Sequence, residues 1–273
     1  MAALPPLRFS VSIETMFREM PFEQRMEHVA ALGFSAFQFW SRNGRDMNIT
    51  LALKTALHLD VSAFIGSTAH LVDRQQHKKF EEDIIRAASL AVDLSCSNLI
   101  VHSGPVLASV PREEQHAAIV EALQAVIPIA QDADVTIVLE PRNQLDYPDN
   151  YLVSSDEGFQ IMRTVNSPHV RLLFSVYHQQ ISEGNLSTRI EKHLDLIGYI
   201  HVADVPGYHE PGTGEISYEY IFAMLREKRY RGFIGLEYEP LVDAKASLRA
   251  VRAMGSSAGD RRGHQGNPLA DHS

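Results

Sequence analysis

The chain contains only one cysteine, Cys96, and one tryptophan, Trp40, among its 273 residues. A single cysteine cannot form a disulfide within the chain, so a reducing, cytoplasmic compartment is expected. No stretch approaches the roughly 20 apolar residues that span a bilayer, which argues against a membrane partner. The first residues lack the basic and apolar segments of a signal peptide. These absences predict a cytoplasmic protein that does not insert into membranes.

Basic residues are also scarce, because 25 Lys and Arg stand against 34 Asp and Glu, for a formal net charge of −9. Without a basic cluster to collect phosphates, nucleic acid is excluded as the main partner. No G-x-G-x-x-G turn, P-loop or H-E-x-x-H motif occurs, and the G-x-S-x-G spacing at residues 255–259 follows no predicted strand, as a nucleophile elbow would require. Cys96 shows no sign of an activated thiolate. Dinucleotide-binding, serine-hydrolase and zinc-protease chemistries therefore have no support in the sequence.

What the chain does contain is an eightfold alternation of short apolar runs and longer segments of helical period. The predicted strands are residues 7–13, 36–40, 61–67, 98–104, 136–141, 170–178, 199–204 and 232–240. Helical segments between strands imply parallel pairing, and eight such units match a closed (β/α)₈ TIM barrel of about 250 residues. A doubly wound sheet is the rival fold, but its glycine-rich turn is missing. We expect one α/β domain, a barrel over residues 1–255, followed by a disordered polar tail over 256–273.

Three helical features are predicted in detail. Residues 113–131 have the pattern of one amphipathic helix. Ser154 and Glu157, three residues later, have the spacing of a capping box at a helix start. The helix over residues 80–94 is expected to bury one face, made of Ile84, Ile85, Ala88, Ala91 and Val92.

In a TIM barrel the chemistry lies at the carboxyl ends of the strands, which share one mouth. Polar residues at the predicted strand ends are therefore candidates for a site: Gln38, His102, Glu140, Asn143, Ser175, His178, His201, Asp204, Glu237 and Glu239. Phe39 and Trp40 could form an apolar wall of this mouth, but core packing is the better interpretation. Arg142 and Glu239 fit supporting or surface positions.

Glu140 and Glu237 each close a strongly apolar strand. A buried carboxylate without a partner costs several kcal/mol, so an arginine or a helix end is the ordinary explanation for either residue alone. A single strand histidine such as His201 is likewise usually a core residue. Two glutamates and a histidine at equivalent strand ends indicate instead a divalent cation site, or proton transfer at a carbon beside a carbonyl group. The proline- and glycine-rich loop 205–215 is expected to fold over this site, with a purely structural role or an oligomer contact as the alternatives.

Three motifs connect these residues to a known family. They are VLEPRN (138–143), HEPGTGEI (209–216) and GLEYEP (235–240), of which HEPGTGEI is the most specific. With these motifs in this order, the chain over residues 7–255 resembles the hydroxypyruvate isomerase family, which belongs to the xylose isomerase-like TIM barrels.

The resemblance implies isomerisation of a small hydroxy-carbonyl compound or short sugar, with Glu140 and Glu237 as proton donor and acceptor. It also implies a divalent metal, Mg²⁺ or Mn²⁺, on four ligands: Glu140, Ser175, His201 and Glu237. Substrate contacts are expected from His102, His178, Tyr208 and His209. A ketose epimerase or a sugar lyase would use the same acid–base pair, and a non-catalytic binding barrel is a third alternative. A homo-oligomer is left open.

Two positions depart from the usual pattern of that family. Ser175 stands where many relatives carry an aspartate ligand, so a neutral hydroxyl replaces a charged oxygen. Tyr208 stands where many relatives carry an arginine, which would suit a substrate carboxylate or hydroxyl. A weaker cation site and altered substrate recognition are therefore expected.

Overall fold

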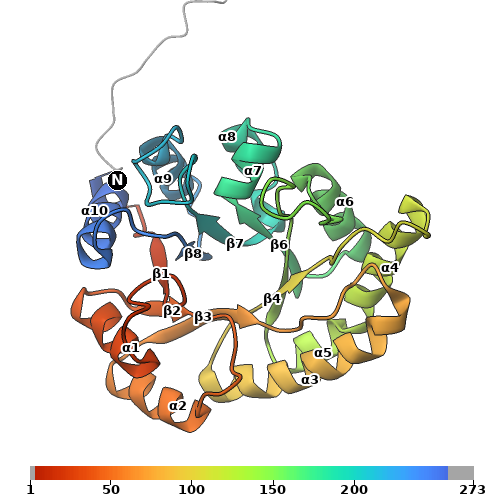
Figure 1. Cartoon of the computed structure of the whole chain (residues 1–273), viewed down its shortest axis with the longest axis horizontal. Coiled ribbons are helices and arrows are strands. Elements are labelled where there is room, and N and C mark those ends of the chain that lie inside the picture. Colours follow the sequence, from red (N-terminus) through yellow and green to blue (C-terminus); the bar gives the residue numbers. More distant parts are fainter. Residues whose placement is uncertain (1–3, 258–273) are drawn as a thin grey trace, which may run out of the picture.

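Eight parallel strands close into a barrel in the computed structural model, which describes residues 4–257 (Figure 1). Each strand pairs with the next along the chain, and the eighth pairs with the first. The strands are β1 (Arg8–Ser12), β2 (Ala36–Gln38), β3 (Asp60–Ile65), β4 (Asn98–His102), β5 (Thr136–Glu140), β6 (Val170–Ser175), β7 (Ile197–Val202) and β8 (Phe233–Leu236). The predicted TIM barrel is confirmed.

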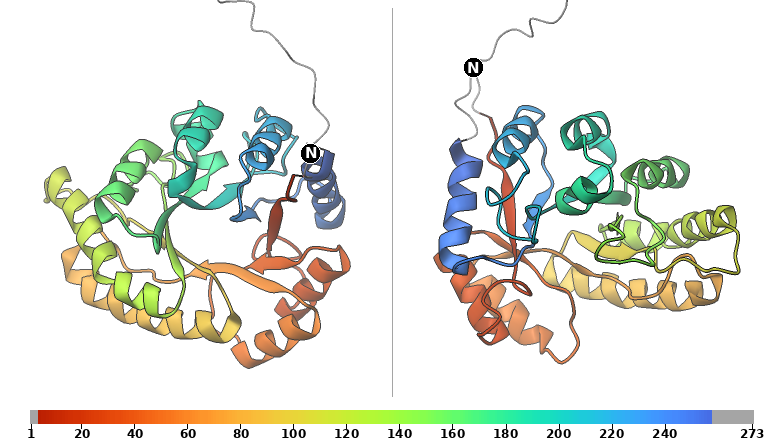
Figure 2. Two further views of the ribbon diagram at one scale, coloured as in Figure 1. Left: turned by 180° about the vertical axis from the view of Figure 1, so that it is seen from behind. Right: turned by 45° about the horizontal axis from the view of Figure 1, so that its top comes forward.

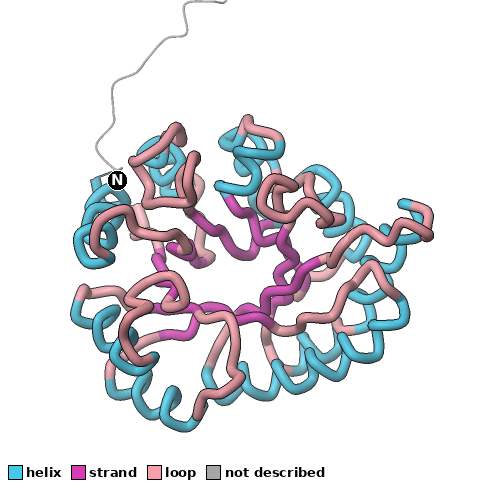
Figure 3. The backbone as a smooth tube through the Cα atoms, in the orientation of Figure 1, coloured by secondary structure: helices cyan, strands magenta, loops and turns pink. Residues whose placement is uncertain are grey.

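Helices surround the barrel and connect its strands (Figures 2 and 3). They are α1 (Phe22–Ala31), α2 (Met47–Ala56), α3 (His77–Leu94), α4 (Arg112–Ala125), α5 (Ile127–Asp132), α6 (Ser155–Val165), α7 (Val176–Ser182), α8 (Leu186–Lys192), α9 (Tyr218–Glu227) and α10 (Ala244–Ser257), with 3₁₀ turns η1 (Arg74–Gln76) and η2 (Leu194–Leu196). Because helices cover the outer face of each strand and side chains fill the interior, both faces are apolar. The strands therefore appear in the sequence as continuous apolar runs.

Two apolar clusters hold these layers together. The cluster inside the barrel is small: Ala36, Ala63, Ile100, Val138, Leu173, Tyr199 and Phe233. The larger cluster lies between the strands and the helices, where Phe39 and Phe64 stack with ring centres 5.2 Å apart. This packing leaves the carboxyl ends of the strands available for polar side chains.

The structure corrects two predictions about the helices. Segment 113–131 forms two helices, α4 and α5, because Pro128 in the first turn of α5 lacks the N–H that a continuous helix would use. Ile85 and Val92 do not belong to the buried face of α3, since they are 50% and 57% exposed. The other three predicted members of that face are buried.

Ser154 caps helix α6, as its position in the sequence predicts. Its hydroxyl accepts a hydrogen bond from the backbone N–H of Asp156 at 3.1 Å. The reciprocal half of the predicted capping box is wrong, because the carboxylate of Glu157 accepts from the hydroxyl of Tyr151 at 2.9 Å and pairs with Arg112.

The sixth strand is shorter than the predicted segment 170–178. It ends at Ser175, whose hydroxyl accepts a hydrogen bond from the backbone N–H of His178 at 3.3 Å and caps α7. His178 therefore lies on a helix. At the end of the chain α10 continues to Ser257, and the rest of the predicted tail, 258–273, lies outside the described residues.

Cys96 lies between α3 and β4 and is buried. Burial raises the pKa of its thiol to about 12, so the residue holds no thiolate near neutral pH, as predicted. Over residues 4–257, no helix combines the length and the apolar character needed to cross a bilayer.

Candidate active site

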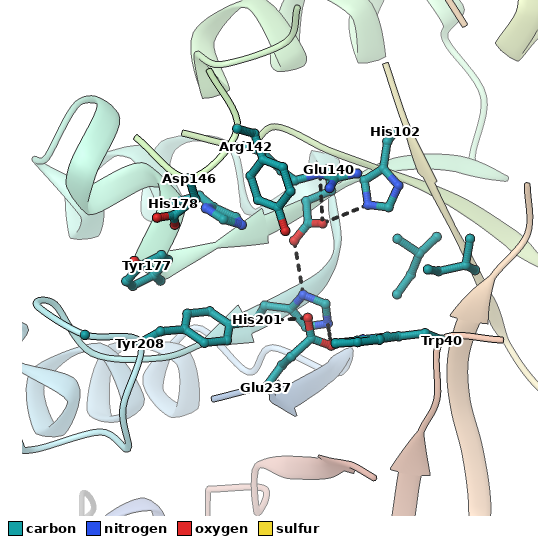
Figure 4. Close-up of a pocket in the computed structure, with 14 residues that line it drawn as sticks. Trp40, His102, Glu140, Arg142, Asp146, Tyr177, His178, His201, Tyr208 and Glu237 are labelled. Atoms are coloured by element: carbon teal, nitrogen blue, oxygen red, sulfur yellow. Dashed lines mark hydrogen bonds and ion pairs between the residues drawn. The ribbon is translucent and has the colours of Figure 1, made fainter. Parts of the chain in front are cut away.

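A cavity of about 610 Å³ opens at the carboxyl ends of the strands (Figure 4). Both predicted catalytic glutamates and three of the predicted histidines line it: Glu140, Glu237, His102, His178 and His201. The strand ends therefore converge on one site, as the barrel topology predicts.

His201 lies between the two glutamates at the centre of this cavity (Figure 4). Its Nδ1 is 3.2 Å from Oε1 of Glu140, and its Nε2 is 3.9 Å from Oε2 of Glu237. The register of β7 and β8 places Gly235 beside His201. A Cβ atom on Gly235 would lie 2.6 Å from the imidazole, so any larger residue at this position would clash with the ring.

Glu237 accepts hydrogen bonds on both carboxylate oxygens. Its Oε2 accepts from Nε2 of Gln38 at 2.5 Å and from Nε1 of Trp40 at 3.1 Å. Its Oε1 accepts from the hydroxyl of Tyr208 at 3.2 Å. Side chains from β2 and from the loops after β2 and β7 thus hold this carboxylate in one orientation.

A buried chain of hydrogen bonds inside the barrel orients the amide of Gln38. The hydroxyls of Ser10 and Ser62 are 2.5 Å apart, and the hydroxyl of Ser62 is 2.7 Å from that of Tyr199. Tyr199 in turn donates to Oε1 of Gln38 at 2.6 Å. The bond from Tyr199 fixes which end of the Gln38 amide carries the oxygen. The nitrogen end therefore points to Glu237 and donates a hydrogen bond to it.

Glu140 is a carboxylate rather than a carboxylic acid. Burial by itself would raise its pKa, but hydrogen bonds from His102 and His201 outweigh burial and hold the pKa well below its usual value. Burial would lower the pKa of His201, but the charges of Glu237 and Glu140 raise it. The directions of both pKa shifts favour a carboxylate at Glu140 beside a protonated imidazole at His201. Burial lowers the pKa values of His102 and His178, which are neutral imidazoles at pH 7.

The loop between β7 and α9 is fixed by the buried carboxylate of Asp204. Its Oδ2 accepts from the backbone N–H groups of Gly212 and Gly214, both at 2.9 Å. Its Oδ1 accepts from those of Val205 at 2.9 Å and Ile216 at 3.1 Å. A Cβ atom on Gly214 would lie 2.0 Å from the carbonyl oxygen of Val205, so only glycine allows this closure. The loop lines one side of the cavity, as its position in the sequence predicts.

Three of the four residues predicted to contact the substrate line the cavity: His102, His178 and Tyr208. His209 does not, because its Nδ1 bonds to the backbone carbonyl oxygen of Glu239 at 2.7 Å. His209 therefore connects the loop to the segment after β8.

The family described as xylose isomerase-like TIM barrel matches residues 26–254 of the chain. The chain belongs to this family. Hydroxypyruvate isomerase of Escherichia coli is 29% identical over 89% of this chain and 97% of its own length. The 2-oxo-tetronate isomerase of Cupriavidus necator is 32% identical over 88% and 96%. These relatives confirm the resemblance that the sequence motifs carry.

Solved structures support the same assignment of the fold. A Brucella melitensis protein called AP endonuclease, family 2, superimposes with a TM-score of 0.84 at 27% identity, over 89% of this chain and 97% of that chain. The 3-keto-D-glucoside 4-epimerase YcjR of E. coli has a TM-score of 0.79 at 18% identity, over 92% and 98%. The epimerase thus shares the fold.

As placed, the four expected metal ligands of this xylose isomerase-like barrel do not fit a cation. His201 has protein partners at both ring nitrogens, Glu140 at Nδ1 and Gln38 at Nε2. Ser175 is neutral, caps α7 and does not line the cavity. Within the described part of the chain, no group of three or more His, Cys, Asp or Glu side chains is arranged to hold a metal. Binding of Mg²⁺ or Mn²⁺ stays a prediction.

The cavity also contains residues that the sequence does not mark as functional. The core-packing interpretation of Trp40 is wrong, because its side chain is 42% exposed and lines the cavity, whereas Phe39 is buried as predicted. Arg142 lines the cavity rather than the protein surface. The other unmarked polar or aromatic residues are Asp146, Tyr147 and Tyr177. They follow β5 and β6, where no periodic pattern indicates which way a side chain points.

Proposed function

We propose that the chain is an isomerase that interconverts a small 2-oxo acid bearing a neighbouring hydroxyl group, such as hydroxypyruvate, with its aldehyde isomer. The names of the relatives support an isomerase acting on a small substrate. The observation that carries the proposal is the placement of two carboxylates, Glu140 and Glu237, on one cavity with the His201 imidazole between them.

The reaction moves one proton between neighbouring carbons and one between their oxygens. A carboxylate removes a proton from the hydroxyl-bearing carbon, and the electron pair of that C–H bond forms a carbon–carbon double bond as the carbonyl electrons move onto oxygen. The hydroxyl proton passes to the former carbonyl oxygen of this enediolate. A proton that the second glutamate shares with His201 is then delivered to the former carbonyl carbon, which leaves an aldehyde at the other carbon, and proton exchange with water restores both glutamates and His201.

The side chains around the cavity are suited to these steps. Glu140 and His201 share one proton, so the pair can accept a proton from carbon or return one. The hydrogen bonds from Gln38 and Trp40 keep Glu237 oriented before the substrate arrives. The positive charge of the imidazolium lies beside the position where negative charge develops on the enediolate oxygens, which stabilises that charge.

Incubation with hydroxypyruvate in D₂O tests this proposal directly. We expect ¹H NMR to show loss of hydroxypyruvate and formation of 2-hydroxy-3-oxopropanoate labelled with deuterium at the new C–H position. A neutral ketohexose is incubated in parallel. Epimerisation of the ketohexose with no conversion of hydroxypyruvate would replace the proposal by the epimerase alternative. Absence of exchange with either compound would favour a non-catalytic binding barrel.

The cation prediction has a separate test at Ser175, which lies opposite His201 in the register of β6 and β7. Ser175→Asp restores a charged oxygen, the ligand type that Mg²⁺ and Mn²⁺ prefer. After loading with Mn²⁺ and desalting, we expect this variant to retain roughly tenfold more metal than the wild type. The bound metal is measured by inductively coupled plasma mass spectrometry. Ser175→Asn, which has similar size and no charge, is the control. Retention of a full equivalent of Mn²⁺ by the wild type would contradict this expectation.

A further inference from the structure

Arg142 is a largely buried cation that donates no hydrogen bond from its side chain to any residue in the described part of the chain. The side chain is 18% exposed, and its Nε is buried without a hydrogen-bond partner. Its ion pair is with Glu140, whose Oε2 lies 3.9 Å from Nε, too far for a hydrogen bond. The guanidinium lies over the ring of Tyr147, 4.4 Å from the ring centre. This contact holds the planar group in place while leaving its N–H donors available.

Two other arginines of similar burial do donate side-chain hydrogen bonds, unlike Arg142. Arg25, whose side chain is 15% exposed, donates hydrogen bonds to three backbone carbonyl groups. Arg45, 22% exposed, donates to both carboxylate oxygens of Glu14 and to one backbone carbonyl group. A buried N–H donor without a hydrogen-bond acceptor, such as Nε of Arg142, costs free energy. The arrangement of Arg142 therefore indicates a partner that the chain itself does not provide.

Arg142 stands where two cavities meet. It lines both the cavity of about 610 Å³ that holds the glutamates and a neighbouring cavity of about 510 Å³. Among the described residues that line either cavity, there is no second arginine and no lysine. Figure 4 shows Arg142 beside Glu140, across the cavity from Tyr208 and Glu237. A negatively charged molecule that enters the site thus meets a permanent positive charge at Arg142.

Tyr208, on the other side of the cavity, does not offer a competing anion site. Its hydroxyl donates to Oε1 of Glu237 at 3.2 Å. A hydroxyl group that already donates to a carboxylate brings no positive charge that could balance the carboxylate of a substrate. The only guanidinium lining this cavity, within residues 4–257, therefore lies on the Glu140 side.

We propose that Arg142 binds the carboxylate of the substrate and selects acids over uncharged hydroxy-carbonyl compounds, a proposal that rests on the function proposed above. A guanidinium donates two parallel hydrogen bonds to a carboxylate. Because Arg142 lies against Glu140, a carboxylate bound there places the adjoining carbonyl carbon at Glu140 and the hydroxyl-bearing carbon toward Glu237. Three carboxylates, those of Glu140, Asp146 and Glu237, line the same cavity as this single guanidinium, which suits a monoanion better than a doubly charged phosphate.

A binding measurement that does not depend on turnover tests this role. Pyruvate lacks the hydroxyl group and cannot isomerise, and pyruvamide replaces its carboxylate with a planar uncharged amide. Trp40 is the single tryptophan of the chain and lines the cavity, so its fluorescence reports occupancy. Titrations are made on the wild type and on Arg142→Met and Arg142→Lys. Arg231→Met is the matched control, because Arg231 is exposed just before β8, at the opposite end of the barrel.

We expect the wild type and Arg231→Met to bind pyruvate at least roughly tenfold more tightly than pyruvamide. Arg142→Met should lose this preference without weaker binding of pyruvamide, and Arg142→Lys should keep part of it. If Arg142→Met does not fold by circular dichroism, Arg142→Lys carries the test, because a lysine cannot donate two parallel hydrogen bonds.

An unchanged preference in the Arg142 variants, or no preference in the wild type, would overturn the role of Arg142 even if hydroxypyruvate is converted. An Arg142-dependent preference without any conversion would instead leave the carboxylate site standing and remove the isomerase proposal. Conversion with an Arg142-dependent preference supports both, and the KM for hydroxypyruvate should then rise at least roughly tenfold in Arg142→Met.

Discussion

Glu140→Gln and Glu237→Gln are each expected to lower kcat for hydroxypyruvate by roughly 10²- to 10⁴-fold while the barrel stays folded. Glutamine has nearly the shape of glutamate, so the packing around each position is kept. An amide cannot accept a proton from carbon or return one, so either half of the reaction stops. Steady-state kinetics and the circular dichroism spectrum of each variant measure the two parts of this expectation.

The two variants should differ in a partial reaction. If the carboxylate of the substrate lies at Arg142, Glu237 faces the hydroxyl-bearing carbon and Glu140 faces the carbonyl carbon. In D₂O, Glu140→Gln should then still exchange hydrogen for deuterium at the hydroxyl-bearing carbon of hydroxypyruvate without forming the aldehyde. Glu237→Gln should do neither, because the first proton is never removed. Exchange in Glu237→Gln alone would reverse the two assignments.

Glu239→Gln is the matched control for these glutamate variants. Glu239 lies two residues after Glu237, but its side chain is 59% exposed and pairs with Arg18 outside the cavity. We expect near wild-type kcat for this variant, because an exposed ion pair contributes little. A kcat near the wild-type value in Glu140→Gln or Glu237→Gln as well would remove that residue from proton transfer.

The barrel could be predicted from the sequence because its determinants are local and repeated. Each strand is covered on both faces, so it appears as an apolar run, and the helical segments between runs fix parallel pairing. The same topology makes the strand ends meet, which is why Glu140, His201 and Glu237 could be assigned to one mouth without coordinates. The end of β6 could not be located this way, because Val176 and Tyr177 continue its apolar pattern after the hydroxyl of Ser175 has started a helix.

Residues that line the cavity from loops were harder to predict. Continuing the alternation of β2 past its end puts Gln38 and Trp40 on one side, where both bond to Glu237, and Phe39 on the other, a signal that could have identified Trp40 as a cavity residue. Arg142 carries no such signal. Arg142 stands out because its buried Nε has no hydrogen-bond acceptor, and this is visible only once the positions of all neighbouring side chains are known. The closed arrangement around His201 likewise depends on Gln38, which lies far away in the sequence.

Asp204→Ala is expected to cause the largest loss of stability of any single change in the loop after β7. Asp204 is fully buried, and its carboxylate accepts four backbone N–H groups. Alanine leaves these donors without an acceptor, and each buried unsatisfied donor costs about 1–3 kcal/mol. Partial opening of the loop to water recovers part of this, so we expect the free energy of unfolding to fall by roughly 3 kcal/mol or more, measured in urea.

The variant should also separate the role of the loop from that of the barrel. Hydrogen exchange at the amides of Gly212, Gly214 and Ile216 should become fast in Asp204→Ala while strand amides stay protected. Asp243→Ala is the matched control, because exposed Asp243 also accepts two backbone N–H groups, from the start of α10, yet water can replace it there. We expect that change to lower the free energy of unfolding by only about 1 kcal/mol. Equal losses of unfolding free energy in the two variants would show that the burial of Asp204 adds nothing to the stability of the loop.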